Sequence, residues 1–141
     1  MNRAVFQAPH EKHPTFGTIW RPVIEVAFRY GRYRIRTDAL VDPGADITLL
    51  PKRLGDALHL KVHPDEPIHE VRGVGEGAVP MAIRRVQLEV GLFKLPIRIG
   101  WTLIEEVPVL LGRLDLFDAF DITYKQAEGT LVFAKRSRVK R

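Results

Sequence analysis

The sequence predicts a mainly β, barrel-like domain with one or two short helices. Three observations carry this prediction. Apolar and polar residues alternate with a period of two over much of residues 18–134, as they do in strands with one buried face. Turn residues, glycine above all, separate the alternating runs. The apolar block at residues 107–112 does not alternate, so we expect it to be buried on both faces.

The N-terminal part of the chain divides into an arm and a hairpin. Residues 1–17 mix prolines, histidines and charges without periodicity, so we expect a flexible N-terminal arm. Residues 24–28 and 33–37 alternate on either side of a turn at residues 30–32, which predicts a hairpin with one solvated face. The second run leads into an acidic turn at Asp42.

The remaining elements follow in a regular order. Pro51 suits a first helical turn, and Leu54 and Leu58 share a face, which predicts one or two turns of helix that Gly55 weakens. A second short helix is predicted after Gly112, where apolar residues have helical spacing. The predicted strands of this part of the chain are residues 68–71, 81–90, 95–101, 120–124 and 130–133.

The net charge of +5 belongs to the C-terminal end of the chain. Five of the 22 basic residues lie in the last seven positions, and the others are balanced by the 17 acidic residues. We therefore expect residues 135–141 to form a basic C-terminal tail and the body to be neutral, with no nucleic-acid partner.

Composition also bears on location and cofactors. The sequence has no cysteine, no apolar leader segment and no apolar run near the ~18 residues of a membrane helix. We expect a cytoplasmic protein with no membrane partner. His59, His63 and His69 form the nearest histidine cluster, but Pro64 interrupts it and no carboxylate helper is evident, so we expect no metal and no cofactor.

The turn at Asp42 lies between two apolar runs, residues 39–41 and 47–50. Such flanks would bury the turn, and the carboxylate with it. Burying a carboxylate costs several kcal/mol unless partners compensate, so a sequence that accepts this cost usually uses the group. Asp-Pro-Gly is also a common turn triplet, and these residues alone leave the turn-only interpretation open.

Three motifs in fixed order indicate more than a turn. They are the run from Leu40 to Thr48 around Asp42, the glycine-rich tip at residues 73–77, and the block Val109-Leu110-Leu111-Gly112-Arg113 before a helix. Together they resemble the retropepsin-like (clan AA) aspartic proteases, the single-domain family that includes the retroviral proteases. The resemblance covers roughly residues 24–133.

The resemblance implies a small closed acid-protease-type barrel over residues 18–134, acting as one subunit of a homodimer. Each subunit would supply one catalytic Asp42, and the two carboxylates would share one proton, because like charges that close cannot both ionise. Pro43, Gly44 and Ala45 would complete the active-site loop. Gly73, Val74, Gly75, Glu76 and Gly77 would form a flap that closes over a peptide or protein substrate bound as an added strand.

The resemblance also implies structural support for the loop. Asp46 and Arg113 would pair beside it, next to Gly112, so that Arg113→Ala would lower stability or dimerisation before it touched chemistry. Pro43 departs from the family pattern, which has Thr or Ser there with a hydroxyl that bonds across the dimer. Proline supplies neither that hydroxyl nor an N–H, which forfeits on the order of 1–3 kcal/mol of dimer stabilisation.

Two functions of different class remain. The leading hypothesis is an aspartic endopeptidase that activates a water with two Asp42 carboxylates, one from each subunit. The alternative is a catalytically silent peptide-binding or dimerisation module on the same fold, which the departure at Pro43 keeps open. The flap and the Gly112-Arg113 block argue against the turn-only interpretation.

Overall fold

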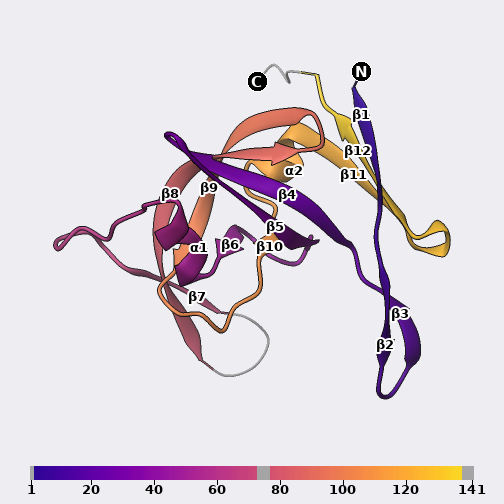
Figure 1. Ribbon diagram of the computed structural model, residues 1–141, viewed down its shortest axis with the longest axis horizontal. Coiled ribbons are helices and arrows are strands. Elements are labelled where there is room, and N and C mark those ends of the chain that lie inside the picture. The colour runs from indigo at the N-terminus through magenta and orange to yellow at the C-terminus, as the bar shows by residue number, and fades with distance from the viewer. Residues whose placement is uncertain (1, 73–76, 138–141) are drawn as a thin grey trace.

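The structure of the chain, a computed structural model, describes residues 2–72 and 77–137. Within these residues the chain is mainly β, as predicted (Figure 1). The strands are β1 (Arg3–Gln7), β2 (His10–His13), β3 (Gly17–Trp20), β4 (Val23–Tyr30), β5 (Tyr33–Val41), β6 (Thr48–Leu50), β7 (His69–Arg72), β8 (Ala78–Val90), β9 (Phe93–Thr102), β10 (Leu110–Leu111), β11 (Phe120–Lys125) and β12 (Thr130–Lys135). The helical elements are α1 (Lys52–Ala57), α2 (Leu116–Ala119) and the 3-10 turn η1 (Gln126–Glu128).

Six strands close into a barrel, which confirms the predicted fold class. Their order is β4-β5-β10-β6-β9-β8, and β8 pairs with β4 to close the ring, while β7 extends β8 outside it. The short strand β10 runs parallel to β5 and antiparallel to β6. It therefore lies between two strands that are consecutive in the sequence, and the chain that joins them must pass the end of β10.

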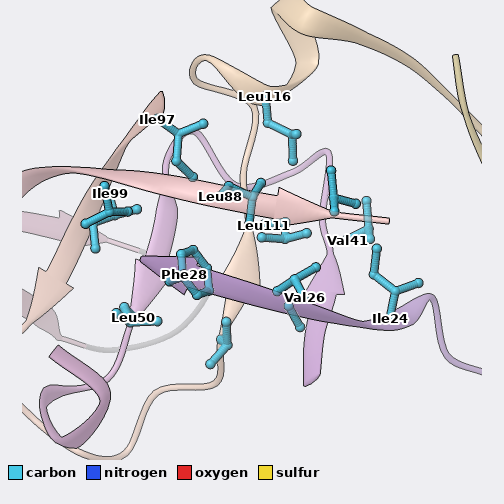
Figure 2. Packing of buried hydrophobic residues seen from close by; sticks show 14 of the residues in the cluster. Ile24, Val26, Phe28, Val41, Leu50, Leu88, Ile97, Ile99, Leu111 and Leu116 are labelled. Carbon is cyan, nitrogen blue, oxygen red and sulfur yellow. The ribbon is translucent and has the colours of Figure 1, made fainter. Parts of the chain in front are cut away.

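The barrel interior is filled by side chains from all sides of the ring (Figure 2). Phe28, Leu88 and Ile99 are fully buried there, as alternation in their strands predicts. Leu111 is fully buried on β10, as expected for the non-alternating block, and Leu116 packs its helix α2 onto the same cluster. The apolar core thus holds β10 and the residues that follow it in a fixed place.

Gly55 weakens the helix prediction, but it is needed for packing. A Cβ at Gly55 would lie 2.0 Å from Nε1 of Trp101, a distance that no packing arrangement tolerates. The indole ring of Trp101 therefore rests directly on the α1 backbone, and its Nε1 donates to the carbonyl of Lys52 at 3.1 Å. Glycine has a low helix propensity, but at position 55 it allows the close contact between α1 and β9.

The expectation of an arm without regular structure at residues 1–17 is wrong for two segments. β1 pairs antiparallel with β12 along its whole length, and together with β11 they form a separate three-stranded sheet. Phe6 packs edge-on against Phe133, with ring centroids 5.2 Å apart. This strand escaped prediction because an edge strand of five residues needs only one or two apolar side chains, too few to establish a period.

The second segment is the β2–β3 hairpin, which stands apart from the barrel (Figure 1). Its residues are mostly polar and exposed, so periodicity could not reveal it. Its base is fixed by Trp20, whose Nε1 donates to the carbonyl of Ala8 at 3.2 Å, and by an ion pair between Arg21 and Glu11. At the other end of the chain, Lys135 ends β12 and Arg136 contacts Asp121 at 3.1 Å.

The segment between α1 and β7 is clamped onto the barrel by one ion pair. Both side chains of the pair Glu66 and Arg84 are about 15% exposed, and Arg84 Nη1 donates to Glu66 Oε2 at 2.8 Å. The guanidinium also donates to the carbonyl of Lys61 at 2.6 Å. The hydrogen bond from Arg84, aided by the backbone N–H of His63, lowers the pKa of Glu66 to about 2.

No helix in the described part of the chain is both long and apolar enough to cross a membrane.

We predict that the Glu66 clamp makes folding stability depend on acidity. A carboxylate whose pKa is depressed in the folded state stabilises it above the unfolded value of about 4.5, and this contribution is lost as pH falls toward about 2. Urea unfolding at pH 7, 4.5, 3 and 2 should show wild type more stable than Glu66→Gln at neutral pH, with most of the difference lost at pH 2.

The control is Glu128→Gln, which removes an exposed carboxylate. Its ion pair with Lys125 is long, at 3.9 Å, and therefore weak. The variant should match wild type at every pH. A difference between wild type and Glu66→Gln that stays constant from pH 7 to pH 2 would contradict the assignment.

Candidate active site

The loop of residues 42–47 joins β5 to β6 and crosses the end of β10. Since β5 and β10 are parallel and paired at Val41 and Leu111, Asp42 and Gly112 leave the barrel at the same end. The backbone N–H of Asp42 donates to the carbonyl of Leu111 at 2.9 Å. The carbonyl of Asp42 accepts the N–H of Ala45 at 3.1 Å, which closes the turn. The β10 strand thus fixes the place at which Asp42 enters the loop.

The crossing requires a glycine at position 112. A Cβ there would lie 2.4 Å from both the carbonyl carbon and the oxygen of Ile47, and 2.9 Å from the oxygen of Ala45. These are backbone atoms of the loop itself, so they cannot move aside without displacing it. The N–H of Gly112 donates to Oγ1 of the buried Thr48 at 3.0 Å. The resemblance implied that Gly112 lies beside the loop. The short distances from a Cβ at this position to the loop backbone explain why the residue must be glycine.

Two further backbone bonds continue the seam between the loop and the segment after β10. The N–H of Arg113 donates to the carbonyl of Ala45, and the N–H of Leu114 donates to the carbonyl of Asp46, each at 2.9 Å. The side chains of Asp46 and Arg113 also pair, with 2.7 Å between Oδ1 and Nη2. They are 87% and 57% exposed, so solvent screens this pair, and the backbone bonds carry most of the support.

The turn itself is not buried within the chain, which corrects the expectation drawn from its flanks. Val41 and Thr48 are buried, but Pro43, Gly44 and Asp46 are exposed and Asp42 is half-buried. The apolar runs are buried in the barrel, and the five residues between them, 42–46, are exposed or half-buried.

The carboxylate of Asp42 is oriented by its own loop. Its Oδ1 accepts the N–H of Gly44 at 2.8 Å. A Cβ at Gly44 would lie 3.1 Å from the same oxygen, so glycine allows this close approach. Within residues 2–72 and 77–137, no hydrogen bond reaches Oδ2 of Asp42, which leaves that oxygen available to a ligand.

A groove of about 440 Å³ opens beside Asp42. It is lined by residues of the 42–47 loop and by Val71, Arg72 and Val79 of the paired strands β7 and β8. Apolar side chains of Ile47, Leu49 and Leu110 line it as well. The groove therefore combines one half-buried carboxylate with an apolar lining.

The expected flap, residues 73–77, falls in the sequence between β7 and β8. Its residues Gly73, Val74, Gly75 and Glu76 lie outside the described residues. Gly77, the last of the expected flap, is exposed and has a φ of +91°, a conformation that favours glycine.

One residue beside the loop was missed by sequence reasoning. The hydroxyl of Tyr124 on β11 donates to the carbonyl of Val41 at 2.7 Å. Burial raises the pKa of this hydroxyl, and the nearby Asp42 carboxylate raises the pKa further. The sequence places Tyr124 in an alternating strand near the C-terminus, and nothing in that alternation shows which carbonyl it reaches.

We predict that Gly112→Ala and Arg113→Ala separate backbone support from side-chain support. Gly112→Ala forces a methyl group into the loop backbone and should cost about 2–3 kcal/mol or more of unfolding free energy. Arg113→Ala removes only an exposed ion pair and should cost less than about 1 kcal/mol. Urea denaturation of both variants tests this, and equal losses would contradict the division of roles.

No family model matches the sequence, and no curated protein matches it. Among solved structures, the EIAV protease in complex with the inhibitor HBY-793 is 21% identical, with a TM-score of 0.49 over 77% of this chain and 93% of that chain.

A second solved structure extends over nearly the whole chain. It is a retropepsin-like aspartic protease from Rickettsia conorii, 14% identical, with a TM-score of 0.60 over 94% of this chain and 93% of that chain. At this identity the likeness concerns the fold alone. The chain therefore has the fold of the retropepsin-like aspartic proteases.

Proposed function

We propose that the chain is an aspartic endopeptidase that acts as a homodimer, with Asp42 as the catalytic residue of each subunit. One observation carries the proposal. A carboxylate with one oxygen that no described residue hydrogen-bonds lies on an exposed turn that lines a groove, in a chain with the retropepsin-like fold. Asp46, the other carboxylate that lines this groove, is paired with Arg113 at the exposed surface. Each chain thus offers half of a two-carboxylate site.

Peptide hydrolysis by this route needs two carboxylates with different protonation. When two of them lie close together, one keeps a proton because like charges at short range cannot both ionise. The ionised Asp42 would take a proton from a water that attacks the scissile carbonyl, and the protonated Asp42 would polarise that carbonyl. A single subunit cannot perform both roles.

The groove suits an extended peptide. Residues of both the Asp42 loop and the β7–β8 pair line it, so a peptide strand in it would lie near strand backbone that can hydrogen-bond to its main chain. Apolar side chains of Ile47, Val79 and Leu110 would face alternate side chains of the substrate. Residues 73–77 would close over the peptide and exclude water.

The exposure of the turn supports the homodimer. Pro43 and Gly44 are exposed between flanks that are themselves fully packed. A second copy of the same turn across a two-fold axis would cover them and bring the two carboxylates together. Pro43 offers no hydroxyl and no N–H to that partner, so we propose a dimer that dissociates more readily than one with Thr or Ser at this position.

The same departure supports one alternative, a peptide-binding or dimerisation module that has lost turnover. It would keep the groove and the fold but would not hold the two carboxylates at the distance that catalysis requires.

We predict that Asp42→Asn abolishes cleavage. The amide cannot act as a general base, so a peptide library incubated at mildly acidic pH should yield products with wild type and none with the variant. Asp38→Asn is the matched control, since Asp38 is an exposed aspartate on β5, the strand that leads to Asp42, four positions before it. It should cleave as wild type does.

A mixing experiment tests the two-chain site. Excess Asp42→Asn subunits added to wild type should lower its activity, because mixed dimers hold one carboxylate, whereas excess Asp38→Asn subunits should not. Equal cleavage by wild type and Asp42→Asn would refute the catalytic role. No cleavage by either protein, together with peptide binding and a dimer in sedimentation, would favour the alternative module.

A further inference from the structure

The geometry points to Tyr124 as a positioning residue for Asp42, itself held in place by Trp20. The inference rests on the proposed function of Asp42. Tyr124 lies on β11, in the three-stranded sheet of β1, β12 and β11, whereas Asp42 follows a barrel strand. The Tyr124 hydroxyl donates to the carbonyl of Val41 at 2.7 Å. This bond therefore connects the three-stranded sheet to the residue that precedes the proposed catalytic Asp42.

The tie acts on a single rigid peptide group. The carbonyl of Val41 and the N–H of Asp42 belong to the same peptide unit, which is planar. Tyr124 holds the carbonyl end, and the carbonyl of Leu111 accepts from the N–H end at 2.9 Å. With both ends held, the plane cannot rotate, and the direction in which Asp42 projects its side chain is set before any ligand arrives.

The Tyr124 hydroxyl is suited to this role at every pH of interest. It is half-buried, and burial together with the Asp42 carboxylate raises its pKa, so it stays protonated and remains a donor. The nearby carboxylate does not accept this proton, because the bond is made to the Val41 carbonyl.

Trp20 fixes the ring that carries this hydroxyl. The two rings meet edge to face, with centroids 6.3 Å apart and planes at 88°. Trp20 is buried, ends β3, and donates from Nε1 to the carbonyl of Ala8 at 3.2 Å. The base of the β2–β3 hairpin is thus connected through Trp20 and Tyr124 to the Asp42 loop. The hairpin therefore contributes to holding the loop in position.

Tyr124→Phe tests the role, because it removes the hydroxyl and leaves the ring against Trp20. The matched control is Tyr33→Phe, another half-buried tyrosine. Its hydroxyl accepts from Arg32 at the far end of β5, roughly 30 Å along the chain from Asp42. For a peptide that wild type cleaves, we expect kcat of Tyr124→Phe to fall about tenfold with KM nearly unchanged. Tyr33→Phe should leave both constants unchanged.

A second readout does not depend on cleavage. The N–H of Gly44 donates to Asp42 Oδ1, so its amide proton chemical shift reports where that carboxylate lies. Tyr124→Phe should move the Gly44 resonance, and Tyr33→Phe should not. If wild type cleaves no peptide, the proposed function fails, and the Gly44 resonance alone decides the role of Tyr124. An unmoved Gly44 resonance, or a KM that rises while kcat stays constant, would overturn the inference.

A variant that keeps the hydroxyl covers the case in which Tyr124→Phe does not fold. 3-Fluorotyrosine at position 124 makes the hydroxyl a stronger donor with little change in shape. We expect it to shift the Gly44 amide proton, whereas 3-fluorotyrosine at position 33 should not. An unchanged Gly44 resonance in the fluorinated protein would also overturn the inference.

Discussion

The site depends on one topological constraint, the crossing of the loop of residues 42–47 over the end of β10. Because β10 lies between β5 and β6, the chain that joins these two strands has to pass over it. Gly112 stands at the crossing, where any side chain would meet the loop backbone at 2.4 Å. The same crossing lines up donors from residues 112–114 with acceptors on Ala45, Asp46 and Thr48. Strand order therefore determines both where Asp42 emerges and how tightly its loop is held.

That support comes mainly from backbone hydrogen bonds, which suits a site proposed to work through a titrating carboxylate. Backbone N–H and carbonyl groups do not ionise between neutral and acidic pH, so acidification leaves these bonds of the loop intact. The charged contact in the loop, Asp46 with Arg113, is exposed and contributes little. The ion pair that does respond to acid, Glu66 with Arg84, holds a segment on another part of the barrel, and its depressed pKa keeps it formed in mild acid.

The sequence predicted the barrel well because its strands bury one face and so alternate. Only the resemblance to a family predicted that Gly112 and Arg113 lie beside the Asp42 loop. No local sequence pattern indicates that β10 inserts between β5 and β6. The strand β1 and the β2–β3 hairpin were missed because their stability comes from pairing and from Trp20 rather than from a periodic apolar face. The expected burial of the Asp42 turn was wrong. Apolar flanking residues predict their own burial but not the burial of the residues between them.

Pro43 makes the internal support of the loop more significant. In the proposed dimer this residue can neither donate to nor accept from the partner turn through its side chain or its nitrogen. The orientation of Asp42 must then come from within its own subunit, and the chain provides it at three points: Leu111 on the N–H of Asp42, Tyr124 on the carbonyl of Val41, and Gly44 on the carboxylate itself. A loop held in this way needs the second subunit to supply a carboxylate but not to shape the turn. We therefore expect loss of the contact across the dimer to weaken association while leaving the geometry of each half-site unchanged.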